Sequence, residues 1–286
     1  MSKASKKNLF LVIFCASLFL ILVIFIYSPP RNSLYTVQHG EVREEFSSDA
    51  ILIREELVIE SQYSGHVNIL IGEGQRVRSG TPVMTVGEEE FMVYAFDTGV
   101  ISFKHDSDEN LFCPGDWTYL ERELITGARN NFSTLRDGQW VREGQFLFRV
   151  VNNFNLYLAI LFPPDQPLPS DGSSFRIEFP RLDREIYWVQ VVDTIFRDRI
   201  VIVEMRQFVD EFLSLRTQQV NVVRGIHRGV VVPREAIVEI EDGYAVLVPG
   251  RGEPVLRRVE LRGGNETMAV VDGLTPGDEV YLQPDY

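Results

Sequence analysis

The sequence predicts a mainly β protein that follows one N-terminal transmembrane helix. Three features of the chain support this prediction. Residues 9–27 carry no charged side chain, residues 60–152 contain two copies of one glycine-rich pattern, and residues 156–228 hold apolar segments rich in β-branched and aromatic side chains. Together they indicate a membrane anchor, a repeated hairpin unit and further β-domains.

Composition and charge exclude several classes of protein. With 45% hydrophobic and 24% charged residues among 286, the chain has the composition of folded domains and is long enough for two or three of them. The formal net charge is −13, and it becomes −16 once the three lysines that precede residue 9 are removed. Such a surplus of negative charge repels nucleic acid, so we expect no nucleic-acid partner. The two cysteines, Cys15 and Cys113, provide no disulfide framework.

Residues 9–27 are predicted to form a single transmembrane helix. At about 1.5 Å per residue they span roughly 29 Å, close to the hydrocarbon thickness of a bilayer. The side chains of Lys3, Lys6 and Lys7 place the N-terminus in the cytoplasm and the rest of the chain outside.

Two other interpretations of this segment are less well supported. A cleaved signal peptide would have a shorter apolar core, and no small-x-small cleavage site precedes Pro29 and Pro30. A lipoprotein would need a small residue before its cysteine, where Phe14 precedes Cys15. We therefore expect an uncleaved anchor, with Cys15 as a packing or lipid-facing residue.

Residues 34–58 alternate loosely between apolar and polar side chains, which predicts short strands. After them comes the repeat, which is the most informative pattern in the chain. Its first copy contains Gly65, Gly74, Val77 and Gly80, and its second contains Gly99, Gly138, Val141 and Gly144 with the same spacing within the last three residues. Glycine accepts positive φ in tight turns, and the valine between two glycines is placed to hold the turn to the core. The sequence therefore predicts two similar β-hairpin units that pack face to face.

Residues 156–228 contain five predicted strands, separated by proline and Asp-Gly turn signals. Within this region Phe208, Phe212 and Leu215 are spaced as on one face of a helix. We expect one short helix there, with its aromatic face plugging the domain formed by the strands.

The repeat resembles a known type of domain. Its first copy is similar to half of a biotinyl/lipoyl domain, a flattened β-sandwich of two such halves. In carrier proteins of this kind a lysine between the halves receives the cofactor, but this chain has the residues GEEEFM at positions 87–92 and its only lysine outside the N-terminal tail is Lys104. The resemblance therefore implies a lipoyl-like domain that carries neither biotin nor lipoate at the usual site, and we expect no cofactor.

A lipoyl-like domain of this kind behind one membrane anchor resembles the membrane-fusion, or periplasmic adaptor, proteins of the HlyD type. The C-terminal region matches the same family's membrane-proximal domain at Pro233, Gly273, Leu274, Pro276 and Gly277. The resemblance implies a cytoplasmic tail and transmembrane helix (1–33), a membrane-proximal β-domain (34–58 with 229–286), a lipoyl-like domain (59–152) with a helical insert (104–135), and a β-barrel (153–228).

The chain departs from the family in two places. Only a dozen residues separate Val86 from Gly99, so the long α-helical hairpin that typical adaptors insert there has no room. Residues 104–135 are extra instead, and Asp116 is predicted to cap a helix that ends at Gly127. The apolar face of this helix comprises Trp117, Leu120 and Leu124. We expect a helical flap covering the sandwich; docking of a partner on the flap is the alternative.

Other candidate sites fail on spacing. Residues 106–110 imitate the start of a calcium loop, but Leu111 replaces the required glycine and Trp117 stands where the bidentate glutamate belongs, so we expect a solvated acidic loop. The four histidines lack metal-ligand spacing, and no catalytic motif is present. We therefore expect no enzyme activity and no metal.

The resemblance implies a non-enzymatic, extracytoplasmic adaptor that joins a transporter or secretion complex of the cytoplasmic membrane to the envelope, and that self-associates. A second hypothesis is a scaffold of envelope biogenesis or division that reuses the fold without transport, which the missing hairpin favours. A carrier or an enzyme would need a modifiable lysine or a catalytic constellation.

Overall fold

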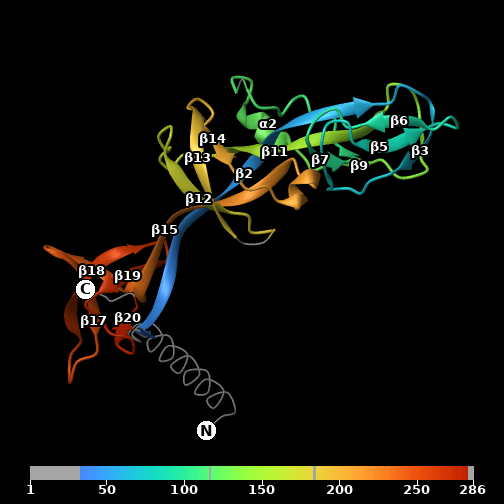
Figure 1. Ribbon diagram of the computed structural model, residues 1–286. Helices are drawn as coiled ribbons and strands as arrows, with labels where there is room; N and C mark the ends of the chain where they lie inside the picture. Colours follow the sequence, from blue (N-terminus) through green and yellow to red (C-terminus); the bar gives the residue numbers. More distant parts are fainter. Residues whose placement is uncertain (1–32, 116, 183–184, 283–286) are drawn as a thin grey trace, which may run out of the picture. The chain divides into compact units, whose positions relative to one another are not determined.

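The computed structural model describes residues 33–115, 117–182 and 185–282. They belong to two compact units, one containing residues 33–42 with 227–282 and the other the described part of residues 43–226 (Figure 1). The predicted transmembrane helix, with the lysines before it and Cys15, lies outside the described residues. Among the described helices none is long and apolar enough to cross a membrane.

The larger unit contains a closed six-stranded β-barrel. Its strand order is β2–β11–β14–β13–β12–β15, and β2 closes the ring because it pairs with both β11 and β15. The strands are β2 (Gln38–Glu60), β11 (Phe146–Leu161), β12 (Ser174–Glu178), β13 (Ile186–Ile195), β14 (Ile200–Met205) and β15 (Thr217–Pro233). The five strands predicted from residues 156–228 are all present.

Alternate side chains of these strands fill the barrel interior, as the period of a strand requires. The 3-10 helix η1 (Asp210–Ser214) adds Phe212, which is fully buried. Its ring packs edge-on against that of Phe179, with 5.2 Å between the ring centroids. Phe208 and Leu215 pack against the same interior. The predicted place of a short helix inside the barrel is confirmed. The predicted face is not, because η1 is a 3-10 helix of five residues that contains Phe212 but neither Phe208 nor Leu215.

The same unit contains a sandwich of two four-stranded layers. The first layer has the order β10–β3–β5–β6 and the second β2–β11–β7–β4. Besides β2 and β11, the strands are β3 (Gly65–Ile69), β4 (Arg76–Val77), β5 (Pro82–Val86), β6 (Phe91–Tyr94), β7 (Gly99–Ser102) and β10 (Trp140–Val141). Their buried valines, isoleucines and phenylalanines form one core between the layers.

Strands β2 and β11 run through both the sandwich and the barrel. Residues 146–151 of β11 pair with β2 in the sandwich, residues 156–160 pair with it in the barrel, and the register shifts between Val151 and Leu156. Residues 43–58 are predicted to belong to the membrane-proximal domain, but they belong to the larger unit. The reason is that Ala50 and Leu52 face the barrel interior, so this stretch is part of one long strand rather than several short ones.

The smaller unit is a separate β-domain with its own apolar core. Besides the start of β2 and the end of β15, it contains β1 (Leu34–Thr36), η2 (Arg234–Ala236), β16 (Ile237–Ile240), β17 (Gly243–Val248), β18 (Val255–Gly264), β19 (Met268–Asp272) and β20 (Glu279–Tyr281). Strand β1 pairs with β20, so the first and last described strands are neighbours. Of the predicted range 34–58, residues 34–42 therefore lie in this domain together with the C-terminal strands.

Candidate functional site

The two copies of the glycine pattern interlock through equivalent hydrogen bonds. The amide of Gly74 donates to the carbonyl oxygen of Ile101 at 2.9 Å, and the amide of Gly138 donates to that of Val67 at 2.8 Å. Each turn of one copy therefore holds the strand of the other copy. This reciprocal arrangement is what the repeated spacing predicts for two halves packed face to face.

The valines and the remaining glycines of the repeat also occupy equivalent places. Val77 is the register partner of Gly99, and Val141 is the register partner of Gly65. Both valines are buried in the sandwich core. Gly74, Gly80, Gly138 and Gly144 all have φ between 74° and 85°, where glycine is favoured.

Two glycines allow close approach of backbone segments. A Cβ atom on Gly65 would overlap the backbone of Gly87, and one on Gly99 would overlap the carbonyl of Val151. Gly87 begins the turn between β5 and β6, so Gly65 fixes where that turn lies. In a carrier domain this is the region of the attachment lysine.

The turn between β5 and β6 is short and acidic. Residues 87–90 connect the two strands directly, and Glu88, Glu89 and Glu90 are exposed. Lys104 lies instead on β8 (Lys104–His105), which pairs with β9 (Ser133–Thr134) at the base of the insert. The place of a carrier's lysine is thus occupied by glutamates, and no helical hairpin separates β5 from β7.

The insert contains a shorter helix than predicted. Helix α2 spans Arg122–Gly127, ending at the predicted residue but beginning five residues after Trp117. The predicted start is wrong because Trp117 and Leu120 close a separate turn, with the Leu120 amide donating to the Trp117 carbonyl at 3.0 Å. The predicted cap, Asp116, is outside the described residues. Ile125, not Leu124, is the buried residue of the helix.

The insert is predicted to cover the sandwich, but in the structure it covers the barrel. Its buried residues Phe112, Leu120 and Ile125 form one core with the outward side chains of three barrel strands, Ile51 and Ile53 on β2, Ala159 and Leu161 on β11, and Ile200 and Ile202 on β14. These strands are apolar on both faces, so their outer face needs a cover. Leu120 is fully buried there, so it is not available to a partner.

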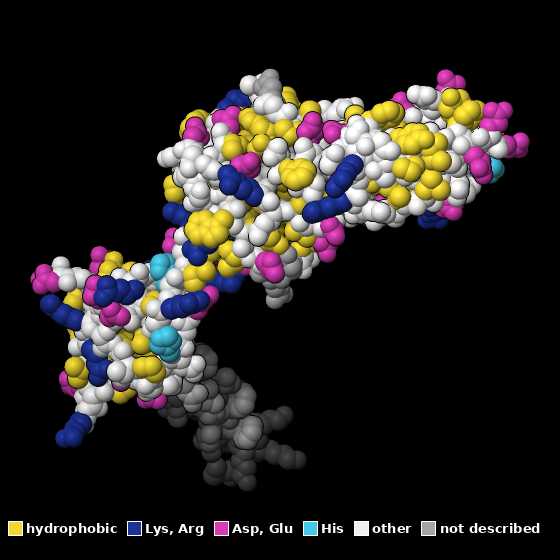
Figure 2. Space-filling model, viewed as in Figure 1, with side chains coloured by type: hydrophobic (Ala, Val, Ile, Leu, Met, Phe, Trp, Pro, Cys, Tyr) yellow, Lys and Arg dark blue, Asp and Glu magenta, His cyan; other side chains and the backbone are white. Residues whose placement is uncertain are grey.

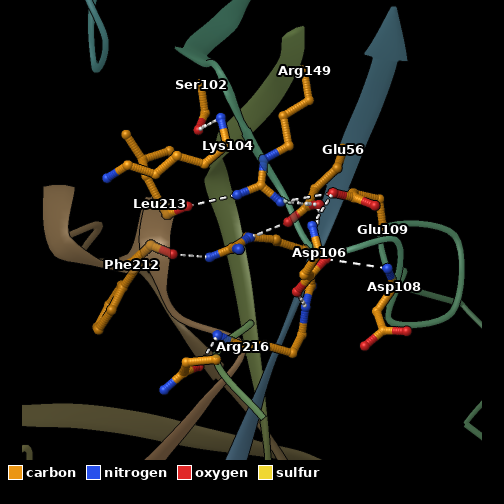
Figure 3. Close-up of polar contacts among 12 residues, drawn as sticks. Glu56, Ser102, Lys104, Asp106, Asp108, Glu109, Arg149, Phe212, Leu213 and Arg216 are labelled. Atoms are coloured by element: carbon orange, nitrogen blue, oxygen red, sulfur yellow. Dashed lines mark hydrogen bonds and ion pairs between the residues drawn. The ribbon is translucent and has the colours of Figure 1, made fainter. Parts of the chain in front are cut away.

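Beneath the insert lies a cluster of six buried charged side chains, three arginines and three carboxylates (Figure 3). Glu56 on β2 contacts all three arginines. It pairs with Arg54, with Arg149 at 2.7 Å and with Arg216 at 3.1 Å. Asp106 of the insert pairs with Arg216 at 2.8 Å, and Glu109 with Arg149 at 3.5 Å.

Helix η1 completes the cluster with backbone acceptors. Arg54 donates to the carbonyl of Phe212, and Arg149 donates to that of Leu213 at 2.6 Å. The cluster thus joins β2, β11, the insert and η1 at the place where sandwich and barrel meet. Three positive and three negative charges balance, which is the arrangement that buried charges require.

The environment shifts the pKa values of these groups. Burial raises the pKa of Glu56, but the three arginines outweigh burial and hold it below its ordinary value. Burial likewise raises the pKa of Asp106, and its hydrogen bonds with Arg216 bring it below the usual range. Burial lowers the pKa of Arg54 to about 10, so its guanidinium stays protonated at neutral pH.

The loop of residues 106–110 is therefore not the solvated acidic loop that the sequence predicts. The carboxylates of Asp106 and Glu109 are engaged by Arg216 and Arg149, and both are nearly inaccessible to solvent. Among the described residues no group of three or more His, Cys, Asp or Glu side chains is arranged to hold a metal. A signal for the cluster is present in the sequence, because Arg54 and Arg149 each interrupt an apolar strand segment.

In the smaller unit the C-terminal motif forms the turn between β19 and β20. Gly273 and Gly277 have φ of 103° and 98°, and Leu274 is buried between them. The Gly277 amide donates to the carbonyl of Val37 at 2.8 Å, and the Val37 amide donates to that of Asp278 at the same distance. The motif therefore binds the chain at Val37, between β1 and β2. The last residue of the predicted motif, Pro233, lies in the same domain at the end of β15.

The outer layer of the sandwich exposes apolar side chains that are not among the site residues predicted from the sequence. Trp140 is 56% exposed and Phe96 is 64% exposed; Leu70, Met92 and Tyr94 are also exposed. Figure 2 shows hydrophobic side chains gathered over the part of the larger unit where Figure 1 labels β3, β5 and β6. Patches of this kind mark interaction surfaces more often than single exposed residues do. The signal is a segment, residues 91–96, that is apolar at every position.

Residues 56–152 match the family model described as "RND related, barrel-sandwich hybrid domain". This segment is a barrel-sandwich hybrid domain. The match begins on β2 at Glu56 and ends where β11 leaves the sandwich, so it covers the hybrid domain with its insert and excludes the barrel. It confirms for this segment the resemblance that was drawn from the glycine repeat.

Solved structures resemble the chain at low identity. ZneB from Cupriavidus metallidurans is 12% identical with a TM-score of 0.38, covering 87% of this chain and 91% of that one. MacA from Actinobacillus actinomycetemcomitans is 10% identical with a TM-score of 0.42, covering 88% and 99%. The membrane fusion protein Spr0693 from Streptococcus pneumoniae R6 is 8% identical with a TM-score of 0.32, covering 62% and 97%. These TM-scores are too low to support a functional inference. No curated protein matches the sequence.

Proposed function

We propose that this protein is a non-enzymatic adaptor of the membrane-fusion type, which joins a transporter of the cytoplasmic membrane to other components of the envelope. The observation that supports the proposal is the hybrid domain of RND-related type whose β5–β6 turn has glutamates in place of an attachment lysine. A domain of this type without a lysine at this turn has no group to modify at the usual site, which favours a role in binding.

The proposal places the protein on the outer face of the cytoplasmic membrane. Residues 9–27 are the single-pass anchor, residues 1–8 are cytoplasmic and the two described units are extracytoplasmic. Fusing alkaline phosphatase to the C-terminus tests this topology, because that enzyme is active only outside the cytoplasm. An active C-terminal fusion and an inactive N-terminal fusion are expected, and the reverse pattern would refute the placement.

The adaptor role is tested by purifying the full chain from membranes in mild detergent and identifying what accompanies it. A multi-pass transporter, or the ATPase of one, is expected in amounts comparable to the chain. A variant with residues 9–27 replaced by an unrelated transmembrane segment should retain this partner if the extracytoplasmic domains bind it. Self-association is part of the proposal, and the mass of the purified complex measures it.

A scaffold of envelope biogenesis or division is the second candidate, because no hairpin of the length used to reach an outer-membrane channel is present among the described residues. The match to an RND-related domain does not favour it. Recovery of only wall-synthesis or division proteins in the same purification would replace the adaptor role by this one.

A further inference from the structure

Strand β6 is an edge of the hybrid domain that lacks the usual protection against pairing (Figure 1). The two layers of the domain end in four strands, β10 and β6 in one layer and β2 and β4 in the other. Strands β4 and β10 have two residues each, and β2 carries the exposed Glu55 and Glu60. Short length and charge are common ways in which proteins prevent pairing at an edge. Residues 91–96 form a longer segment in which every side chain is apolar.

The outward backbone groups of β6 are open to a further strand. The Ala95 amide donates to the carbonyl of Thr81 at 2.8 Å, and the Ala95 carbonyl accepts from the amide of Gly80 at 2.7 Å. The direction of the backbone groups alternates along a strand, so Met92 and Tyr94 present theirs on the side away from β5. Of the described strands only β5 pairs with β6. The edge therefore presents donors and acceptors that fit an extended segment.

The exposed side chains along this edge are apolar. Met92 is 43% exposed, Tyr94 is 45% exposed and Phe96 is 64% exposed. They lie on one face of the sheet because they are two residues apart. A strand added beside β6 would place its own side chains next to them as cross-strand pairs, which stabilise a sheet most when aromatic and β-branched residues meet. The edge therefore favours an apolar segment.

The end of β6 at the β5–β6 turn is acidic. Residues 88–90 are three exposed glutamates, and none of them forms an ion pair with a described lysine or arginine. Glu143 lies nearby, since its amide donates to the Ser64 hydroxyl at 3.1 Å, and the adjacent Arg142 has the opposite charge. His66 directs a ring nitrogen at a backbone carbonyl at 2.8 Å. The charge of the three glutamates is therefore not compensated within the described chain.

The opposite end of β6 has no net charge. Asp97 follows Phe96 there, and the Phe96 carbonyl accepts from the Ser79 hydroxyl at 3.0 Å, which brings the neighbouring Arg78 to the same end. A second copy that paired antiparallel with β6 would place this end beside the glutamates, and a copy that paired parallel would place glutamates beside glutamates. Neither arrangement compensates the acidic end, and two chains of formal charge −13 repel each other. The edge therefore favours a different protein.

We propose that β6 is the docking site for an extended apolar segment of a partner protein, which adds to the sheet as an antiparallel strand and carries lysine or arginine at its C-terminal end. Antiparallel pairing continues the pattern of this layer and places the basic end beside residues 88–90. Backbone hydrogen bonds supply affinity, and the apolar and basic side chains supply specificity. The inference does not depend on the proposed function, because an adaptor and a scaffold would both present this edge.

Two synthetic peptides test the inference on the purified full chain in detergent. Each contains about eight alternating valines and threonines, which favour a strand, and a run of lysines at the C-terminal end in one peptide and at the N-terminal end in the other. Both termini are blocked. Hydrogen exchange is resolved to single residues by mass spectrometry. The first peptide should slow exchange of the Met92 and Tyr94 amides at least about tenfold and leave that of Val93 unchanged. At low salt it should bind roughly fivefold more tightly than the second.

Substitutions separate the backbone contact from the charge contact. Tyr94→Pro removes one outward donor at a position where an edge strand tolerates proline, and it should weaken binding at least about tenfold. Tyr94→Thr is the matched control, because it also removes the ring but keeps the amide, and it should weaken binding less. Glu88→Gln, Glu89→Gln and Glu90→Gln together should make the two peptides bind equally. The first peptide with methylated backbone amides leaves the protein unchanged and should not bind.

Several results would overturn the inference. One is the absence of protection at Met92 and Tyr94 at about 1 mM peptide. Others are protection of Met92 that persists in Tyr94→Pro, equal binding of the two peptides to the unchanged protein, and protection of these amides by dimerisation of the chain without peptide. The adaptor role is refuted only when purification from membranes yields no transporter, so the two failures are distinguishable.

Discussion

Gly65 and Gly87 show how one missing side chain sets the geometry of the hybrid domain. A methyl group on Gly65 would overlap the Gly87 backbone, which has no flexible end that could move away. We expect Gly65→Ala to lower the free energy of unfolding by roughly 1–3 kcal/mol, the usual cost of overpacking. Urea denaturation followed by circular dichroism measures this change.

Gly72→Ala is the control for this substitution. A Cβ atom at Gly72 would have no heavy atom within 4 Å, and the residue has no positive φ. Its replacement should therefore leave stability nearly unchanged. Equal effects of the two substitutions would show that close approach at Gly65 is not what constrains the turn.

Glu56 is the carboxylate on which the buried cluster depends, because it contacts all three arginines. Glu56→Gln removes one negative charge and leaves a surplus of buried positive charge. We expect it to destabilise the larger unit by roughly 3–5 kcal/mol. The neighbouring Glu55→Gln is the control, since Glu55 is exposed and bonds only to Asn152 among the described side chains. If the two variants unfold at the same urea concentration, the cluster does not stabilise the fold.

The cluster also predicts how stability depends on pH. Glu56 and Asp106 have pKa values below those of unfolded chains, which are about 4. The stability that they contribute is full above that pH and is lost as pH falls through the folded pKa values. Urea titrations at pH 7 and pH 3 should show a smaller loss of stability in Glu56→Gln than in the unchanged protein. A loss of equal size would assign acid sensitivity to other carboxylates.

At the scale of elements, the insert is held by an apolar contact with the barrel and by three ion pairs, Asp106 with Arg216, Glu109 with Arg149 and the exposed Glu121 with Arg197. Asp106→Asn weakens its pairing with Arg216 while keeping the shape of the side chain. We expect hydrogen exchange in residues 104–135 to accelerate by at least about tenfold, which corresponds to ~1.4 kcal/mol of local stability. Asp108→Asn in the same loop is the control, because Asp108 pairs with none of the cluster's arginines. Unchanged exchange in Asp106→Asn would mean that the pairing of Asp106 with Arg216 does not hold the insert.

The elements that can be predicted from the sequence are those with a strong local pattern. The repeated glycine spacing predicts the two halves of the hybrid domain, and alternation with turn signals predicts β12, β13 and β14. The start of helix α2 is harder to predict from the sequence. Trp117, Leu120 and Leu124 have helical spacing, but the first two belong to a turn. Spacing alone does not distinguish a helix from a turn followed by a shorter helix.

Arg54 and Arg149 stand out in the sequence as charges within apolar strand segments, but the groups that pair with them cannot be predicted, because the members of the cluster are distant in the chain. Arg54, Asp106 and Arg216 come together only when β2, the insert and the segment before β15 are packed. An arginine in a strand is ordinarily expected to reach solvent. The same limitation explains why the sequence predicts a solvated acidic loop and an insert over the sandwich, both of which are wrong.

At the scale of the whole molecule, the hybrid domain and the barrel share β2 and β11 and meet at the charged cluster. The family resemblance assigns residues 43–58 to the wrong domain, and the sequence pattern does not correct it, because a long strand crossing two domains has no break in its pattern. The partner is not predictable from the sequence, since the face that a β-domain presents to a partner depends on register across several strands.

In the proposed function this protein joins a transporter to the envelope. Crosslinking in intact cells with a carboxyl-reactive reagent tests it most directly, because the chain has 41 acidic residues, whereas Lys104 is the only lysine after the N-terminal tail. We expect crosslinks from the extracytoplasmic domains to a multi-pass transporter of the cytoplasmic membrane. Crosslinks only to wall-synthesis or division proteins would contradict it.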